Sequence, residues 1–137
     1  SIENEIKIVA ETTTDNSISV NEVLDGKDII FFQQLIRKIP INDSVLKYAV
    51  NLAAKTRPNT ELALPITNQY VNWGAGPRAS QYLVLGAKTH ASLRGKYSLD
   101  IEDVKAVAPS ILRHRIIKNY KAEAENISIE NIIGKLL

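Results

Sequence analysis

Apolar residues recur every three or four positions along most of the 137-residue chain, and this helical period limits the fold more than any other feature. Capping residues, glycines and prolines interrupt the period and predict where each helix begins and ends. Helices are expected at about 2–12, 28–39, 43–55, 77–93, 101–107, 110–120 and 129–137. The sequence therefore predicts an all-α fold, a bundle of about six or seven helices.

A short β pairing is the exception that this pattern leaves open. The two candidate segments are "SISV" at 17–20 and "LALPITNQYV" at 62–71. The wider region 57–72 carries two prolines and has no regular period, so no helix is predicted there.

Length and composition favour one domain over 1–137, because an apolar fraction of 45% can supply its core. The absence of cysteine excludes a disulfide framework and a thiolate metal site. A net charge of +2 gives no general reason to expect binding to nucleic acid or to a membrane. No apolar run approaches the ~20 residues of a membrane span and no signal-peptide pattern opens the chain, so a cytoplasmic protein is expected.

The segment "NWGAGPRASQYLVLGAKTHASLRG", residues 72–95, predicts a helix with a cation at its positive end. Pro77 suits the first turn, since its missing N–H would have no partner there, and Gly74 and Gly76 suit a tight approach to the helix. Arg78 then lies in the first turn, where a positive charge is unfavourable by roughly 0.3–1 kcal/mol unless an anion is nearby. From the residues alone, a bound anion and a solvent-exposed arginine are equally open explanations.

The sequence contains no self-sufficient set of catalytic residues. A Walker A loop needs Gly-Lys followed by Ser or Thr, whereas the three Gly-Lys pairs here precede Asp28, Tyr97 and Leu136. The two histidines, His90 and His114, lie far apart without ligand spacing. His90 shares the small, apolar face of its helix and is interpreted as a core or edge residue. We therefore predict neither a metal site nor independent enzymatic activity.

Arg113 and Arg115 open a basic run over 113–121 that could contact nucleic acid phosphates. A solvated helix face is the favoured interpretation, because a charge run alone predicts binding poorly. The acidic Glu123 and Glu125 that follow weaken the nucleic-acid interpretation further.

The motifs "WGAGPRAS", "AKTHASLRGKYSLDIEDVKAVAPSILRHRI" and "YKAEAENISIENIIGKLL" resemble the C-terminal helical lid of the MoxR family of AAA+ ATPases. That lid opens with Gly-Ala-Ser-Pro-Arg-Ala and continues through an "LRG" turn, a "PEDV" helix start, "AP", "LRHR" and "EAEG". Gly76, Ile101 and Asn126 depart from this pattern without removing an ionisable group. The likeness is specific over 73–137 and looser over 1–60.

The resemblance implies that Arg78 is the sensor-2 arginine, which contacts the phosphates of ATP bound to a separate core. Pro77 would fix the start of its helix, and Gly76 would let the backbone pass close to a neighbour. Trp73 is expected to be a packing anchor rather than an adenine stack. Gly86 is expected to let a second helix approach closely.

The resemblance also implies a parent chain that hydrolyses ATP with magnesium, forms a ring, usually hexameric, and remodels other proteins in a chaperone-like way. Its expected partners are its own AAA+ core, neighbouring subunits and von Willebrand factor A-type proteins. This chain alone is expected to bind no cofactor tightly. A helical interaction or DNA-binding module without a nucleotide role is the alternative.

Overall fold

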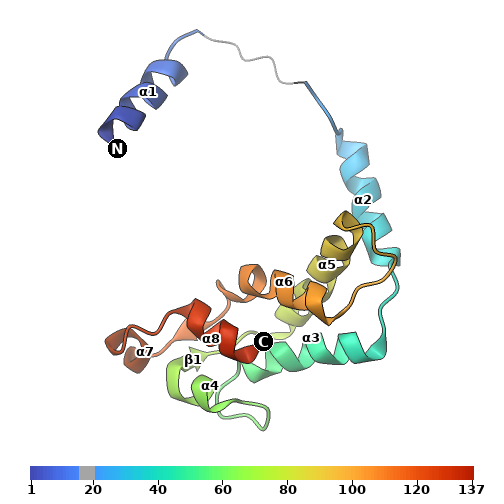
Figure 1. Cartoon of the computed structure of the whole chain (residues 1–137), viewed down its shortest axis with the longest axis vertical. Coiled ribbons are helices and arrows are strands. Elements are labelled where there is room, and N and C mark those ends of the chain that lie inside the picture. Colours follow the sequence, from blue (N-terminus) through green and yellow to red (C-terminus); the bar gives the residue numbers. More distant parts are fainter. Residues whose placement is uncertain (16–20) are drawn as a thin grey trace. The chain divides into compact units, whose positions relative to one another are not determined.

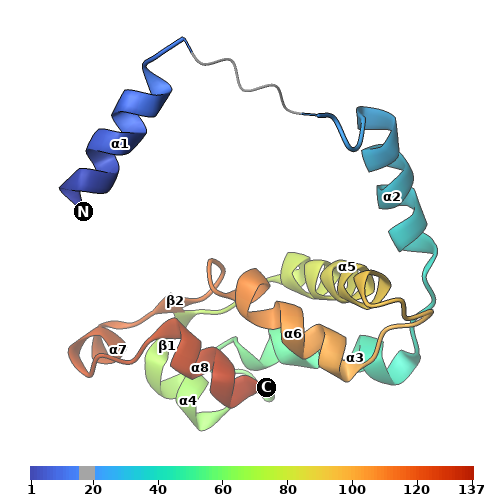
Figure 2. The same cartoon turned by 45° about the horizontal axis from the view of Figure 1, so that its top comes forward.

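The computed structural model describes residues 1–15 and 21–137, so the predicted pairing at 17–20 lies outside the described residues. The chain divides into two units, Ser1–Ile30 and Phe31–Leu137. Figures 1 and 2 show their elements in two views.

The first unit contains α1 (Ile2–Thr12), which begins where Ser1 caps it: the Ser1 hydroxyl accepts from the Asn4 amide at 3.4 Å. The apolar side chains of α1 are exposed, Ile2 at 76% and Ile6 at 64%. Helix α2 (Gly26–Lys38) begins in this unit and ends in the second. The carboxylate of Asp25 caps α2 by accepting from the Asp28 amide at 2.9 Å.

The core of the second unit is made by α3 (Asp43–Lys55), α5 (Pro77–Leu93) and α6 (Ile101–Leu112), which pack side by side (Figure 2). Small and branched residues fill the shared interior, and many are fully buried: Ala49, Ala53, Ala79, Leu83, Ala87, Ala91, Val104, Ala108 and Leu112. Gly86 permits the close approach of α5 and α6, because a Cβ there would lie 3.0 Å from the Cδ1 of Ile111. The close approach predicted for Gly86 is therefore confirmed.

The remaining elements surround a two-stranded antiparallel sheet. Strand β1 (Val71–Trp73) pairs with β2 (Ile117–Lys118), Val71 opposite Lys118 and Trp73 opposite Ile117. Three short helices lie near it in Figure 2: α4 (Pro65–Tyr70), α7 (Tyr120–Ala124) and α8 (Ile129–Leu136). Helix α8 contributes Ile132, Ile133 and Leu136 to the core.

The all-α class is confirmed, with one small β pairing that begins at the end of the predicted segment 62–71. The described residues contain eight helices rather than six or seven. The two extra ones, α4 and α7, have only six and five residues, too few to show a helical period.

The segment 110–120, predicted as a new or kinked helix after Pro109, is helical only as far as Leu112. Helix α6 continues through Pro109 to Leu112, and the chain then turns into β2. Proline cannot donate to the carbonyl four residues earlier, but the fully buried Ala108 and Leu112 on either side hold the last turn in place. Ile117 lies on this short strand and is 57% exposed.

Candidate functional site

The start of α5 is an open helix N-terminus. Gly76 is its N-cap and has no side chain to accept from the first-turn amides, and Pro77 occupies the first turn. Arg78 is exposed, and among the described residues no hydrogen bond or ion pair involves its side chain. The charge of Arg78 and the positive end of the helix dipole therefore lie together without an anion from the described part of the chain.

The loop that leads into α5 is fastened to the end of α3. Gly74 is required there, because a Cβ would lie 2.2 Å from the carbonyl oxygen of Thr56. The Ala75 amide donates to the Thr56 hydroxyl at 2.8 Å, and the Nε of Arg57 donates to the Ala75 carbonyl at 2.8 Å. The close approach predicted for Gly74 is thus confirmed, whereas no described atom lies within 4 Å of a Cβ at Gly76.

A groove of about 570 Å³ opens beside this loop, and we call it the α5 groove. Its lining comprises Trp73, Gly74, Gly76, Pro77, Arg78, Ala79, Tyr82 and Arg115. Both charged side chains in that lining are arginines, and no carboxylate of the described residues belongs to it. The α5 groove is consequently suited to an anionic ligand.

Trp73 lines both the α5 groove and a second hollow of about 490 Å³, which Arg57, Pro58 and Asn59 help to line. Its side chain is 69% exposed. Trp73 is therefore not buried among the described residues, and its role as a packing anchor stays a prediction. An exposed indole beside a basic groove can pack against a ligand or another protein surface.

Sequence reasoning missed Tyr82 and the position of Arg115 in this site. Tyr82 lies one helical turn after Arg78, on the same face of α5. The guanidinium of Arg115 lies 5.1 Å from the centre of the Tyr82 ring, a cation–π distance. The i, i+4 spacing of Arg78 and Tyr82 was readable in the sequence, but the contact with Arg115 joins distant segments and had no local signal.

The basic run over 113–121 does not form one open cationic face. The Nε of Arg113 lies 2.6 Å from a carboxylate oxygen of Glu130, and Lys118 lies 3.1 Å from Glu123. Arg115 instead faces Tyr82 in the α5 groove. Neutralised cations of this kind contribute little to phosphate binding, which weakens the nucleic-acid interpretation.

A second polar cluster joins the end of α5 to the start of α6. The Asp103 carboxylate is buried and accepts from His90 Nδ1 at 2.8 Å and from Lys96 Nζ at 3.0 Å. It also completes a capping box with Asp100. Burial raises the pKa of Asp103, but the Asp100 amide, His90 and Lys96 outweigh it and lower the pKa to about 2. The interpretation of His90 as an edge residue agrees with this structural role.

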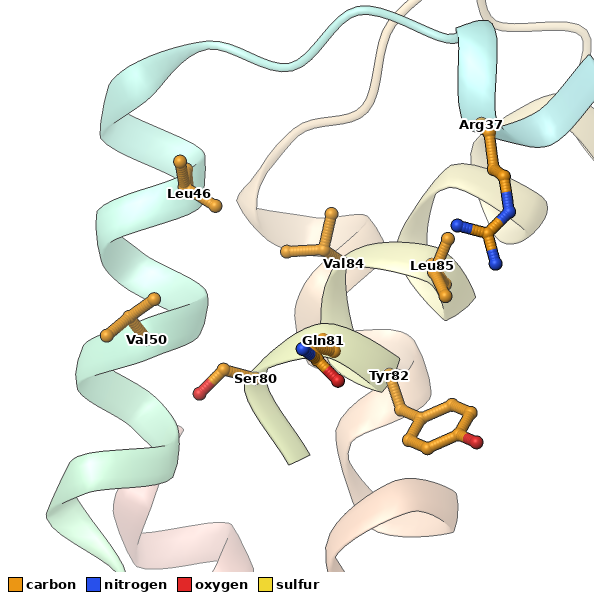
Figure 3. Close-up of a pocket in the computed structure, with 8 residues that line it drawn as sticks. All are labelled: Arg37, Leu46, Val50, Ser80, Gln81, Tyr82, Val84 and Leu85. Atoms are coloured by element: carbon orange, nitrogen blue, oxygen red, sulfur yellow. The ribbon is translucent and has the colours of Figure 1, made fainter. Parts of the chain in front are cut away.

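A third feature is a groove of mixed polarity between α3 and α5, about 580 Å³ in volume (Figure 3). Leu46 and Val50 line it and are 41% and 45% exposed. The ring of Tyr82 points away from these two side chains (Figure 3).

No group of three or more His, Asp or Glu side chains in residues 1–15 and 21–137 could hold a metal ion. None of the helices described above is long and apolar enough to cross a membrane.

Comparison with known proteins gives consistent matches. The family model for the AAA lid domain matches residues 64–136. The chain is 30% identical to the chaperone MoxR1 of Mycobacterium tuberculosis over 116 residues, which is 85% of this chain and 31% of MoxR1. It is 27% identical to the uncharacterized protein YeaC of Bacillus subtilis over 119 residues, 87% of this chain and 34% of YeaC.

A crystal structure of a candidate ATPase from Cytophaga hutchinsonii has the same fold, with a TM-score of 0.80 and 34% identity. The match covers 99% of this chain and 42% of that one. The chain thus spans about a third of the length of the curated relatives it matches.

Proposed function

The chain belongs to the AAA lid domain family, and from this premise we propose that it is the lid of a MoxR-type AAA+ ATPase in which Arg78 contacts ATP. The observation that carries the proposal is the unpaired Arg78 at the open N-terminus of α5. A phosphate placed there would meet both the guanidinium and the positive end of the helix dipole. It would supply the anion that the described residues lack.

The residues of the α5 groove fit the phosphates of ATP rather than the metal that accompanies them. Arginine is permanently charged and presents a planar fork of N–H donors, which matches phosphate oxygens. The groove lining contains no carboxylate, so magnesium would be held by the nucleotide-binding core. In this arrangement Pro77 and Gly76 set the position of Arg78, and Arg78 stabilises negative charge on the phosphates.

The lid would couple nucleotide state to movement. An arginine that binds a phosphate present only before hydrolysis makes different contacts in the two states, and that difference can shift the lid against the core. The parent protein would act in the cytoplasm as a ring, usually hexameric, that remodels other proteins in a chaperone-like way. Neighbouring subunits and von Willebrand factor A-type proteins are the proposed partners.

Substitution of Arg78 in the full-length parent tests the proposal. Loss of one charge-assisted hydrogen bond costs about 1.5–3 kcal/mol, so Arg78→Ala should slow ATP hydrolysis about ten- to a hundredfold. Arg78→Lys should restore only part of the rate, because a point charge cannot reproduce the fork.

Arg113→Ala is the matched control, since Arg113 is also an exposed arginine but is paired with Glu130. Thermal melting of the 137-residue chain with the same substitutions separates function from folding. Unchanged turnover in Arg78→Ala would remove Arg78 from the site. A large fall in melting temperature would make it a structural arginine instead.

A further inference from the structure

Arg115 shares the α5 groove with Arg78 although it comes from a distant part of the chain, between α6 and β2. Arg78 and Tyr82 lie one turn apart on α5, and the Arg115 guanidinium lies over the Tyr82 ring. The fold therefore brings two arginines and a tyrosine to the lining of one groove.

The guanidinium of Arg115 is oriented without being neutralised. Its Nη1 donates to His114 Nε2 at 2.6 Å, and the Tyr82 ring lies 5.1 Å away. Its Nε is fully buried and has no hydrogen-bond acceptor among the described residues. No carboxylate of the described chain pairs with it, whereas the neighbouring Arg113 is paired with Glu130.

An arginine held in this way is unusual in energetic terms. A buried donor without an acceptor is unfavourable, and more so when the group is charged. Keeping two like charges in one groove adds repulsion. That repulsion falls when an anion binds in the groove that both arginines line.

We propose that Arg115 is a second anion-binding residue, which together with Arg78 forms a two-arginine site for a polyphosphate chain. Tyr82 is the positioning residue that holds the Arg115 guanidinium at the groove. The proposal rests on the proposed function for its ligand, because ATP supplies a chain of phosphates. The function proposed for Arg78 does not depend on Arg115, so the role of Arg115 is a separate proposal.

Titration of the 137-residue chain with sodium tripolyphosphate tests the two-arginine site directly, in buffer of about 20 mM ionic strength to limit screening. Arginine Nε–H signals are followed by NMR. In the unsubstituted chain, the signals of Arg78 and Arg115 should shift with one common dissociation constant, and the signal of Arg113 should stay in place.

The variants Arg78→Gln, Arg115→Gln and Arg113→Gln each remove one positive charge. The first two should weaken binding about three- to tenfold, and the third should change it less than about twofold. Tyr82→Leu should weaken binding as Arg115→Gln does, whereas Tyr82→Phe, which keeps the ring, should not. Amide spectra of each variant verify the fold.

The outcomes separate this inference from the proposed function. If Arg115→Gln behaves like Arg113→Gln, or if the Arg115 signal does not move in the unsubstituted chain, the two-arginine site is wrong while the role of Arg78 stands. If tripolyphosphate shifts neither arginine, the site is also wrong. ATP hydrolysis by Arg78 variants of the full-length parent tests the proposed function independently of either result.

Discussion

At the scale of single residues, Gly74 and Asp103 have structural roles that their residue types alone do not reveal. Gly74 and Gly76 flank Ala75 in the same loop, but only Gly74 lies against another part of the described chain. Asp103 is a buried acid whose carboxylate accepts hydrogen bonds from His90 near the end of α5 and from the Asp100 amide at the start of α6. Both residues support the position of α5, which carries Arg78.

Gly74→Ala should lower the free energy of unfolding by at least about 2 kcal/mol, because its Cβ would meet the backbone of Thr56 at 2.2 Å. Gly76→Ala is the matched control and should change stability by less than about 0.5 kcal/mol, since nothing described lies within 4 Å. Urea unfolding of the 137-residue chain measures both. Equal effects of the two substitutions would contradict the fastening of the loop to α3.

Asp103 should make stability depend on pH in acid. Its pKa is lowered to about 2 in the folded chain, so its ion pairs stabilise the fold fully above the pKa of an unfolded aspartate, near 4. That contribution is lost as the pH falls toward 2. Asp103→Asn should therefore unfold more easily at pH 7, by about 2 kcal/mol, and lose much of the acid dependence.

Melting temperatures between pH 7 and pH 2 measure the effect of Asp103→Asn. Asp100→Asn is the control, because asparagine also caps helices well and Asp100 is more exposed. An acid dependence that is identical in the unsubstituted chain and in Asp103→Asn would show that Asp103 is not the group that titrates.

At the scale of elements, the sequence predicted long helices well and short ones poorly. The segment 77–93 is α5 as expected, because Pro77 and Arg94-Gly95 mark its ends. Helices α4 and α7 were not predicted, because each has fewer than two turns and therefore shows no helical period. The strand at Ile117 was missed because its pairing partner, Trp73, is distant in sequence.

The residues of the candidate site also differ in whether local sequence could identify them. Arg78, Pro77 and Gly76 were identified from local chemistry and from the family resemblance, and their roles toward ATP stay predictions. The sequence places Arg115 in a basic run and leaves open whether it pairs with acidic residues of the bundle or faces another subunit. Its place in the α5 groove depends on how α6 and β2 return the chain to α5, which no local pattern encodes.

The contact between α5 and α6 should show coupling between Gly86 and Ile111. Gly86→Ala gains helix propensity of about 1 kcal/mol, but its Cβ would lie 3.0 Å from Ile111 Cδ1. Ile111→Val removes that atom, so Gly86→Ala should be more stabilising in the Ile111→Val background, by about 0.5–1 kcal/mol. A double-mutant cycle from urea unfolding measures this coupling. Additive effects would mean that the two helices do not pack as described.

At the scale of the whole molecule, the chain is an AAA lid domain, and the ATP contact proposed for it would be only part of a nucleotide site. None of its Gly-Lys pairs continues to Ser or Thr, so it lacks a Walker A loop. One domain over 1–137 remains a prediction, since the structure gives two units whose relative position is not described.

The purified 137-residue chain should not hydrolyse ATP with magnesium above background. Phosphoryl transfer depends on phosphate and metal positioning, which this chain would receive from the core. A coupled phosphate-release assay, with the full-length parent as the positive control, measures this. Magnesium-dependent turnover that survives an additional purification step would contradict the assignment of catalysis to a separate core.

The fastening of the 74–76 loop to α3 has a mechanical consequence. If this loop were flexible, a movement of Arg78 on ligand binding would change the loop conformation and leave α3 in place. Here the backbone of Gly74 lies against Thr56, and Ala75 is hydrogen-bonded through both its N–H and its C=O. These contacts leave the connection little slack, so a displacement at the start of α5 is expected to be transmitted to the end of α3.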